Sequence, residues 1–238
     1  MTDKGEIPQE LLEIGNFIVT DTRGLGEYLK CAHISLDKIP LQARVLEIGS
    51  SFSQRFAREL RSFRPDVFTI SLDPSLALPV APGSYTNNRI KHPEKVIFTY
   101  NSSRTRGEFK QPYSKTRLKR MQEAEPGTIA ATINLPIASS SQDLVVDMYA
   151  AAMYLNNGSL GRYYREIVRV LKPGGEAHIY PVSTRYEYLN RTPLRTSRQR
   201  VENEFSTMPD NQQLQFYKEK DYYGETRLGL IIVKENVI

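Results

Sequence analysis

The chain of 238 residues contains one cysteine, Cys31. A single cysteine cannot form an intramolecular disulfide, and it excludes a zinc site built from several cysteines. No apolar run approaches the roughly 20 residues that a membrane-spanning helix needs, so no membrane location is expected. The first residues, 1–6, show no basic segment followed by an apolar one, so a secretory signal is not expected and a cytoplasmic location is.

Composition and charge narrow the class of protein. Hydrophobic residues make up 39% of the chain and charged residues 25%, a balance typical of a globular protein. A length of 238 residues suits one large α/β domain and is short for two. The formal net charge of +5 permits contact with a polyanion such as nucleic acid, but ordinary solvated surface explains such an excess equally well.

The stretch from Leu41 to Asp73 predicts a strand, a helix and a second strand. Residues 44–48 predict a buried strand, which Gly49 ends, and residues 67–72 predict the second strand, which Asp73 ends. Between them, four apolar residues recur at helical spacing: Phe52, Phe56, Leu60 and Phe63. A glycine after a strand, then a helix, then an acid at the end of the next strand is typical of a nucleotide-binding α/β unit.

The flanking segments are less regular. Residues 1–40 predict a helical segment that packs on the edge of the sheet or over its mouth, and residues 41–238 predict the α/β domain, with an irregular basic insertion at about 74–127. Within the insertion, residues 104–120 combine basic side chains with Phe109 and Tyr113. Such a stretch can grip a phosphodiester backbone and stack on bases. A solvated loop followed by a basic helix face is the alternative interpretation.

The second half of the chain predicts the rest of the sheet. One amphipathic helix is predicted over residues 161–171, with Pro173 and two glycines after it. Alternating or continuously apolar patterns predict five further strands: 128–133, 143–148, 176–182, 213–220 and 227–234. With the two strands of the first unit, the predicted sheet has seven strands, and the last two form a hairpin.

Five segments in this order carry a resemblance: Val45–Gly49, Asp73, Asn134–Ile137, Gln142–Val146 and Ile167–Gly175. Together they resemble the class I S-adenosylmethionine-dependent methyltransferase family, closest to its small-molecule branch. The similarity covers about residues 41–182, and the helix that ends in Arg-Val-Leu-Lys-Pro-Gly-Gly is its most specific part. The resemblance implies a Rossmann-like, doubly wound and mostly parallel seven-stranded sheet with a C-terminal antiparallel β-hairpin. It also implies methyl transfer from S-adenosylmethionine to a small or medium-sized acceptor.

The resemblance further implies the positions of the site residues, all at the carboxyl ends of predicted strands. Glu47 and Gly49 would lie against the methionine part of the cofactor, Asp73 would bind the ribose hydroxyls, and Leu135 and its neighbours would wall the adenine. Asp147 would face the methyl group as a base or substrate contact, with a cofactor-shell or helix-capping carboxylate as the alternative. The implied cofactor-binding residues are Glu47, Gly49, Ser50, Ser51, Asp73, Pro74, Asn134, Leu135, Asp147 and Met148.

The sequence departs from the family pattern at three places. Ser51 and Ser53 stand where the family usually has glycines, and Ala131 stands where an acid often binds the adenine amino group. No Asn/Asp-Pro-Pro-aromatic motif follows residues 143–148, which argues against methylation of nucleic-acid amino groups. A protein of this fold that has lost catalysis and binds nucleic acid through residues 104–120 is therefore a second hypothesis. Another nucleotide-dependent Rossmann-like enzyme is a third.

Two further groups of side chains have open interpretations. Tyr149, Tyr154 and Tyr163 can line an acceptor pocket or pack in the core. A basic cluster can bind a carboxylate or phosphate of the acceptor, or can lie on the surface before a predicted helix at 197–205: Arg185, Arg191, Arg195, Arg198 and Arg200. The sequence predicts no metal site and leaves the oligomeric state open.

Overall fold

The computed structural model describes residues 24–50, 54–72, 135–155, 157–184, 187–188, 190–209, 211–221 and 224–235. Asp73, Pro74, Asn134, Ser51 and Ser53 lie outside these ranges, as do the strand predicted at 128–133 and the basic stretch 104–120. The described elements, in chain order, are α2 (Leu25–Cys31), η1 (Leu36–Lys38), β1 (Arg44–Ile48), α3 (Arg55–Phe63), β2 (Phe68–Leu72), β3 (Gln142–Met148), α5 (Ala151–Tyr154), α6 (Asn157–Val170), β4 (Leu171–Tyr180), α8 (Leu194–Phe205), β5 (Gln212–Lys220) and β6 (Thr226–Lys234).

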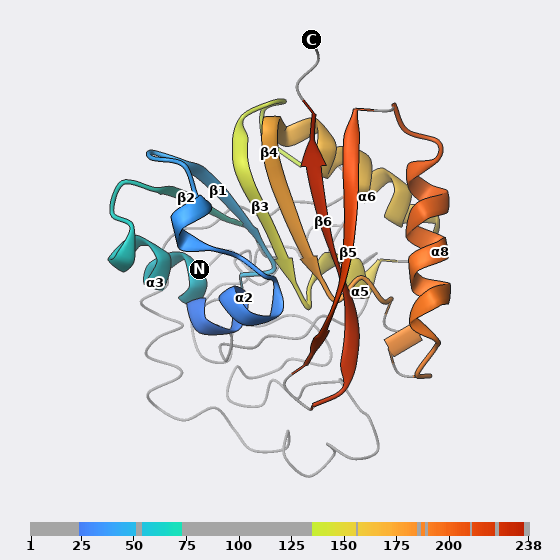
Figure 1. Cartoon of the computed structure of the whole chain (residues 1–238). Helices are drawn as coiled ribbons and strands as arrows, with labels where there is room; N and C mark the ends of the chain where they lie inside the picture. Colours follow the sequence, from blue (N-terminus) through green and yellow to red (C-terminus); the bar gives the residue numbers. More distant parts are fainter. Residues whose placement is uncertain are drawn as a thin grey trace, which may run out of the picture.

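These strands form one mixed sheet in the order β2-β1-β3-β4-β6-β5 (Figure 1). The first four run parallel, with Val45 of β1 paired to Leu144 of β3 and to Thr69 of β2. Strand β6 is antiparallel to both β4 and β5. The described part of the sheet therefore has six strands and belongs to the α/β class, with a doubly wound order in which the chain leaves β1 for β2 and returns to the other side of β1 at β3.

Helices cover both faces of this sheet because residues along each strand alternate between two apolar clusters. Leu46 and Val145 pack with α6 and α8 on one face. Val45 and Val146 pack with α2 and α3 on the other face. Figure 1 shows the two pairs of helices on opposite sides of the sheet. None of the helices in the described ranges combines the length and the apolar character that crossing a membrane requires.

The helix predicted after Gly49 corresponds to α3, but one of its predicted core residues was wrong. Phe56 and Leu60 are fully buried, whereas Phe63 is 68% exposed. Phe63 is the last residue of α3, and the chain turns away through Arg64, so its side chain lies beyond the buried stripe. Phe68 of β2 is also 64% exposed. Its partner in the ladder, Arg44, is exposed too, so this end of the sheet meets solvent.

The boundary between α6 and β4 also differs from the prediction. The helix ends at Val170, one residue early, because the last carbonyl groups of α6 accept hydrogen bonds from the Ser140 and Ser141 N–H groups. Leu171 then pairs with Gln142, and the ladder shifts register before Leu144 pairs with Glu176. The Pro-Gly-Gly segment thus lies inside β4, where a Cβ on Gly175 would be 3.0 Å from two carbonyl oxygens.

Candidate functional site

The loops at the carboxyl ends of the parallel strands meet at one edge of the sheet, which is the usual position of ligands in open α/β sheets. Gly49 follows β1, and Tyr149 and Ala150 follow β3. The Gly49 N–H group donates a hydrogen bond of 2.7 Å to the Leu72 carbonyl at the end of β2. Three strand ends, from β1, β2 and β3, are therefore drawn together here.

Gly49 has two reasons to be a glycine. Its φ angle is +77°, in the left-handed region that residues with a Cβ seldom adopt. In addition, a Cβ at this position would overlap the side chain of Ala150 in the loop after β3. The sequence suggested that this glycine lets the backbone approach a ligand. The structure shows that it also lets two loops of the site approach one another.

Two larger residues at the same edge have left-handed backbones as well. Gln54, at the N-cap of α3, has φ +44°, and Tyr149 has φ +55°. Such conformations cost on the order of 1–3 kcal/mol each and concentrate at functional sites. The side chain of Gln54 is buried, and its Oε1 has no hydrogen-bond partner among the described residues. A buried amide oxygen beside the start of a helix needs a donor that a ligand can supply.

Glu47 is held inside the protein by two neighbouring elements. It is 1% exposed, and its carboxylate accepts hydrogen bonds of 3.1 Å from the Tyr28 hydroxyl of α2 and from the Ser71 hydroxyl of β2. Tyr28 in turn stacks on Phe56 of α3, with ring centroids 4.2 Å apart. The carboxylate thus ties α2 and α3 to the ends of β1 and β2. Its predicted contact with the methionine part of a cofactor stays a prediction.

Asp147 caps a helix. Its two carboxylate oxygens accept 3.1 Å hydrogen bonds from the backbone N–H groups of Ala150 and Ala152. One of them also accepts a 2.5 Å hydrogen bond from the Tyr163 hydroxyl of α6. Burial, and then the charge of Asp147, raise the pKa of Tyr163 well above its ordinary value. These contacts match the helix-capping alternative, and a catalytic role for Asp147 stays a prediction.

Leu135 lies in the core and is anchored by α6. The Glu166 carboxylate accepts a 2.7 Å hydrogen bond from the Leu135 N–H group. Arg169 donates to the carbonyl oxygens of Leu135 and Ile137, at 2.9 and 2.8 Å, and pairs with Glu166. The hydrogen bond from Arg169 is the main reason that the pKa of Glu166 lies below its usual value. Met148 is also buried, at the end of β3, and Ser50 is buried next to Gly49.

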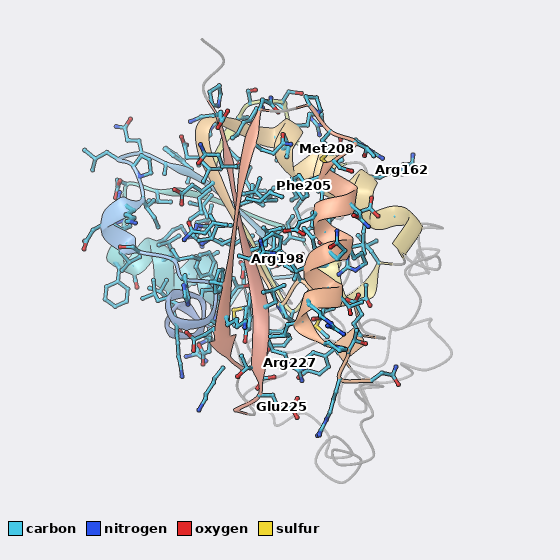
Figure 2. The ribbon with its side chains drawn as sticks, turned by 45° about the vertical axis from the view of Figure 1, so that its right-hand side comes forward. Arg162, Arg198, Phe205, Met208, Glu225 and Arg227 are labelled. Carbon is cyan, nitrogen blue, oxygen red and sulfur yellow. The ribbon has the colours of Figure 1, made fainter. Side chains whose placement is uncertain are left out.

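The sequence interpretation named Tyr149 but missed the aromatic and charged side chains that surround it at this edge. Tyr149 contacts Tyr180 at the end of β4 and Tyr188, with centroid distances of 5.6 and 6.3 Å and near-perpendicular rings. Arg227 lies 3.8 Å above the Tyr188 ring and donates a 3.1 Å hydrogen bond to buried Asp221. Figure 2 shows Arg227 at the lower end of the β5–β6 pair. Asp221 and Arg227 flank the turn between two predicted strands, which is the signal that could have brought them together.

Burial controls the ionisation of this cluster. It is the largest cause of the raised pKa values of Tyr149 and Tyr180. Neutral phenols therefore line this end of the sheet. Tyr163, by contrast, lies in the core against Asp147 and Tyr164, so it does not line the edge.

The basic cluster predicted after the fifth strand is dispersed. Arg200 pairs with Glu187 at 3.0 Å, Arg198 pairs with Glu202, and Arg191 pairs with Glu225. Arg195 is exposed, and Arg185 lies outside the described ranges. Arg191, Arg195 and Arg198 match the surface alternative, whereas Arg200 is largely buried with Glu187. Within the described ranges, no group of three or more His, Cys, Asp or Glu side chains is arranged to hold a metal ion.

Comparisons with known proteins locate the fold. No family model matches the sequence, and no curated protein matches it significantly. A solved structure from Methanococcus maripaludis, assigned to the S-adenosyl-L-methionine-dependent methyltransferases, aligns with a TM-score of 0.51 and 15% identity over 87% of this chain and 84% of its own. The N-methyltransferase NodS from Bradyrhizobium japonicum, in complex with S-adenosyl-L-homocysteine, has a TM-score of 0.44 and 13% identity over 82% and 79% of the two chains. The alignment with the Methanococcus maripaludis structure shows that the chain has the Rossmann-like fold found in S-adenosylmethionine-dependent methyltransferases.

Proposed function

We propose that the protein is an S-adenosylmethionine-dependent methyltransferase that acts on a small or medium-sized acceptor. The cofactor, when bound, supplies a methyl group on a sulfonium. The protein has to align the acceptor with that group and exclude water from both. The fold supports this proposal, as does the absence from the sequence of the motif typical of nucleic-acid amino methylation.

One observation carries the proposal: strained backbone and an unsatisfied buried oxygen coincide where β1 ends. Gly49 and Gln54 both have left-handed backbones, and Oε1 of Gln54 has no partner in the described part of the chain. S-adenosylmethionine carries an ammonium group and two ribose hydroxyls, and such an oxygen can accept a hydrogen bond from any of these donors. The residues at this edge of the sheet therefore match the hydrogen-bonding groups of S-adenosylmethionine in chemical type.

The proposed cofactor contacts extend along the edge of the sheet. Glu47, Gly49, Ser50 and Ser51 would hold the methionine part, and Asp73 with Pro74 would hold the ribose. Asn134 and Leu135 would wall the adenine, and Asp147 and Met148 would face the methyl group. The aromatic cluster of Tyr149, Tyr180 and Tyr188 is the proposed wall for the acceptor, because its rings offer apolar contact and neutral hydroxyls.

The proposal includes a complete seven-stranded sheet. A seventh strand, predicted at 128–133, would pair along the free edge of β2, and strands β5 and β6 would form the C-terminal hairpin. Slow amide hydrogen exchange over residues 128–133 is the expected result. Exchange as fast as in an unfolded peptide would contradict the seventh strand.

Isothermal titration with S-adenosylmethionine and S-adenosylhomocysteine tests the cofactor. Micromolar binding is expected, and Asp73→Ala should abolish it because the ribose loses its acceptor. Asp37→Ala is the matched control, since Asp37 is an exposed aspartate of η1. No binding of either compound to the unaltered protein would contradict the proposal.

Gln54→Met separates ligand binding from folding. This change removes the unsatisfied oxygen and keeps a side chain of similar length. Cofactor binding should weaken roughly fivefold to tenfold, because one hydrogen bond is lost. The free energy of unfolding should stay the same or rise. Equal loss of stability and binding would mean that Gln54 serves the fold alone.

A further inference from the structure

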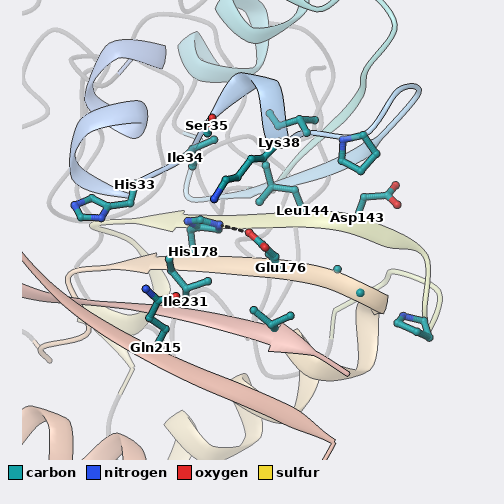
Figure 3. A pocket seen from close by; sticks show the side chains of 16 residues that line it. His33, Ile34, Ser35, Lys38, Asp143, Leu144, Glu176, His178, Gln215 and Ile231 are labelled. Carbon is teal, nitrogen blue, oxygen red and sulfur yellow. Dashed lines mark hydrogen bonds and ion pairs between the residues drawn. The ribbon is translucent and has the colours of Figure 1, made fainter. Parts of the chain in front are cut away.

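A cavity lies away from the loops after β1 and β3, on the sheet face that α2 and α3 cover. Its volume is about 290 Å³. It is lined by Asp143 and Leu144 at the start of β3 and by residues 173–176 of β4. It therefore occupies the amino-terminal half of these strands, whereas the proposed cofactor site lies at their carboxyl ends. Figure 3 shows it between the strands and the segment that contains η1.

The floor of this cavity combines three aliphatic side chains with Glu176, which lies between two of them. Leu144 and Glu176 are neighbours across β3 and β4, and Glu176 and Val233 are neighbours across β4 and β6. Ile231 lies two residues from Val233 on the same strand, paired with His178. Three aliphatic side chains thus form a floor that can hold an apolar body.

The segment before β1 forms the opposite wall. Ile34, Ser35, Lys38 and Ile39 come from this segment. One end is closed by His33, whose ring stacks on Tyr217 at a centroid distance of 4.0 Å. Figure 3 shows Lys38 extending across the cavity toward His178. Aliphatic side chains on the floor that face an ammonium group on the wall make an amphipathic arrangement.

Both acids around the cavity already have hydrogen-bond partners. Both carboxylate oxygens of Asp143 accept hydrogen bonds from Lys172, at 2.7 and 2.8 Å. Nδ1 of His178 lies 2.6 Å from the Ala32 carbonyl oxygen, and Nε2 lies 3.0 Å from Glu176. A carbonyl oxygen only accepts, so Nδ1 donates to Ala32. Asp143 and Glu176 are each therefore already engaged by a side chain of the protein.

Three donors in the lining have no such partner. The side chains of Lys38, Ser35 and Gln215 make no hydrogen bond or ion pair with any residue in the described ranges. Gln215 stands at the foot of the cavity, opposite Ile231 in the ladder. The Lys38 ammonium, which lacks an ion-pair partner there, favours an anionic group over a cationic one, and the hydroxyl and the amide can donate to the same group.

We propose that this cavity binds a small organic anion: an apolar body on Leu144, Ile231 and Val233, with a carboxylate on Lys38. A volume of about 290 Å³ is at the lower limit of ligand pockets and suits on the order of ten non-hydrogen atoms. The site is separate from the proposed methyltransferase site and does not depend on that proposal.

Octanoate is the probe, and octylammonium is its counterpart of opposite charge. Amide chemical-shift titrations on the isotope-labelled full-length protein should give a dissociation constant of about 1 mM or tighter for octanoate. The shifts should concentrate in residues 34–39, 174–176 and 231–233. Lys38→Met should weaken binding roughly fivefold to tenfold, because a partly exposed ion pair is lost.

Lys218→Met is the matched control. Lys218 is exposed on β5, and its position, three residues from Gln215, alternates to the other face of the sheet. The Lys218→Met variant should bind octanoate as the unaltered protein does. Absence of octanoate binding, equal binding of octylammonium, or unchanged binding in Lys38→Met would each overturn the proposed anion site.

Discussion

Three glycines of this protein allow the approach of the β1 and β3 loops to be measured. Gly49 has φ +77° and lies against Ala150, whereas Gly224 has the same φ with open space around a would-be Cβ. Gly26 lies within α2 and has open space too. Replacing each by alanine therefore separates three effects. Gly224 reports backbone strain alone, Gly49 reports strain together with side-chain overlap, and Gly26 reports helix propensity. The comparison tests the geometry at the centre of the proposed site without requiring a ligand.

The expected changes in the free energy of unfolding follow from these differences. Gly224→Ala should lose about 1 kcal/mol, because an alanine in the left-handed region is strained. Gly26→Ala should gain about 0.5–1 kcal/mol, because alanine favours a helix. Gly49→Ala should lose about 2–4 kcal/mol, because overlap with Ala150 adds to the strain. Such a loss is a large part of the stability of an ordinary domain.

Urea unfolding followed by far-ultraviolet circular dichroism gives these values, provided the slope with denaturant stays constant. The double variant Gly49→Ala/Ala150→Gly should recover the overlap part, with a coupling of about 1–3 kcal/mol between the two positions. If Gly49→Ala costs no more than Gly224→Ala and shows no coupling with Ala150→Gly, the two loops do not touch as described.

Two further predictions concern α6 and the buried tyrosines. Arg169→Met should lower the free energy of unfolding by about 1–3 kcal/mol and speed amide exchange over residues 135–139, which Arg169 and Glu166 hold. Arg165→Met changes an exposed position on the same helix and should alter neither quantity. Equal effects of the two substitutions would refute the role of Arg169 in holding residues 135–139. Burial raises the pKa of Tyr164 to about 12, and it also raises the pKa values of Tyr149, Tyr163, Tyr180 and Tyr217. Because these folded-state pKa values exceed the unfolded value of about 10, the free energy of unfolding should be unaffected below pH ~10 and fall above it by up to about 1.4 kcal/mol per tyrosine per pH unit. Unfolding measured at a series of pH values, with tyrosinate absorbance recorded in parallel, gives this dependence. A free energy of unfolding that stays constant to pH ~11 would refute the prediction.

The sheet could be predicted from the sequence where local pattern decides the structure. Apolar residues predominate in residues 44–48 and 143–148, and both are strands within one residue of the prediction. Gly49 was identified from its position alone. The predicted burial of Phe63 was wrong because helical spacing predicts a buried stripe but does not indicate which turns of the helix contact the rest of the protein. The early end of α6 depends on Ser140 and Ser141, nearly thirty residues upstream.

The site was harder to predict because its contacts join distant parts of the chain. One partner of Glu47 is Tyr28 on α2, and one partner of Asp147 is Tyr163 on α6. No local pattern indicates either pair, because each depends on how a helix packs on the sheet. The cavity beside Lys38 likewise combines β3, β4, β5 and β6 with the segment before β1. Residue types at strand ends predicted the candidate site residues. Packing decides which of these side chains already make hydrogen bonds within the protein.

The return of the chain to the inner side of β1 has a consequence for synthesis on the ribosome. Val45 pairs with Leu144, 99 positions later, and a ribosome adds about 5–20 residues per second. One side of the first strand to emerge therefore waits on the order of 5–20 s for its neighbour. During that interval its apolar side chains and unpaired amides are open to chaperones and to other nascent chains, so slowing translation between these two strands should lower the yield of native protein.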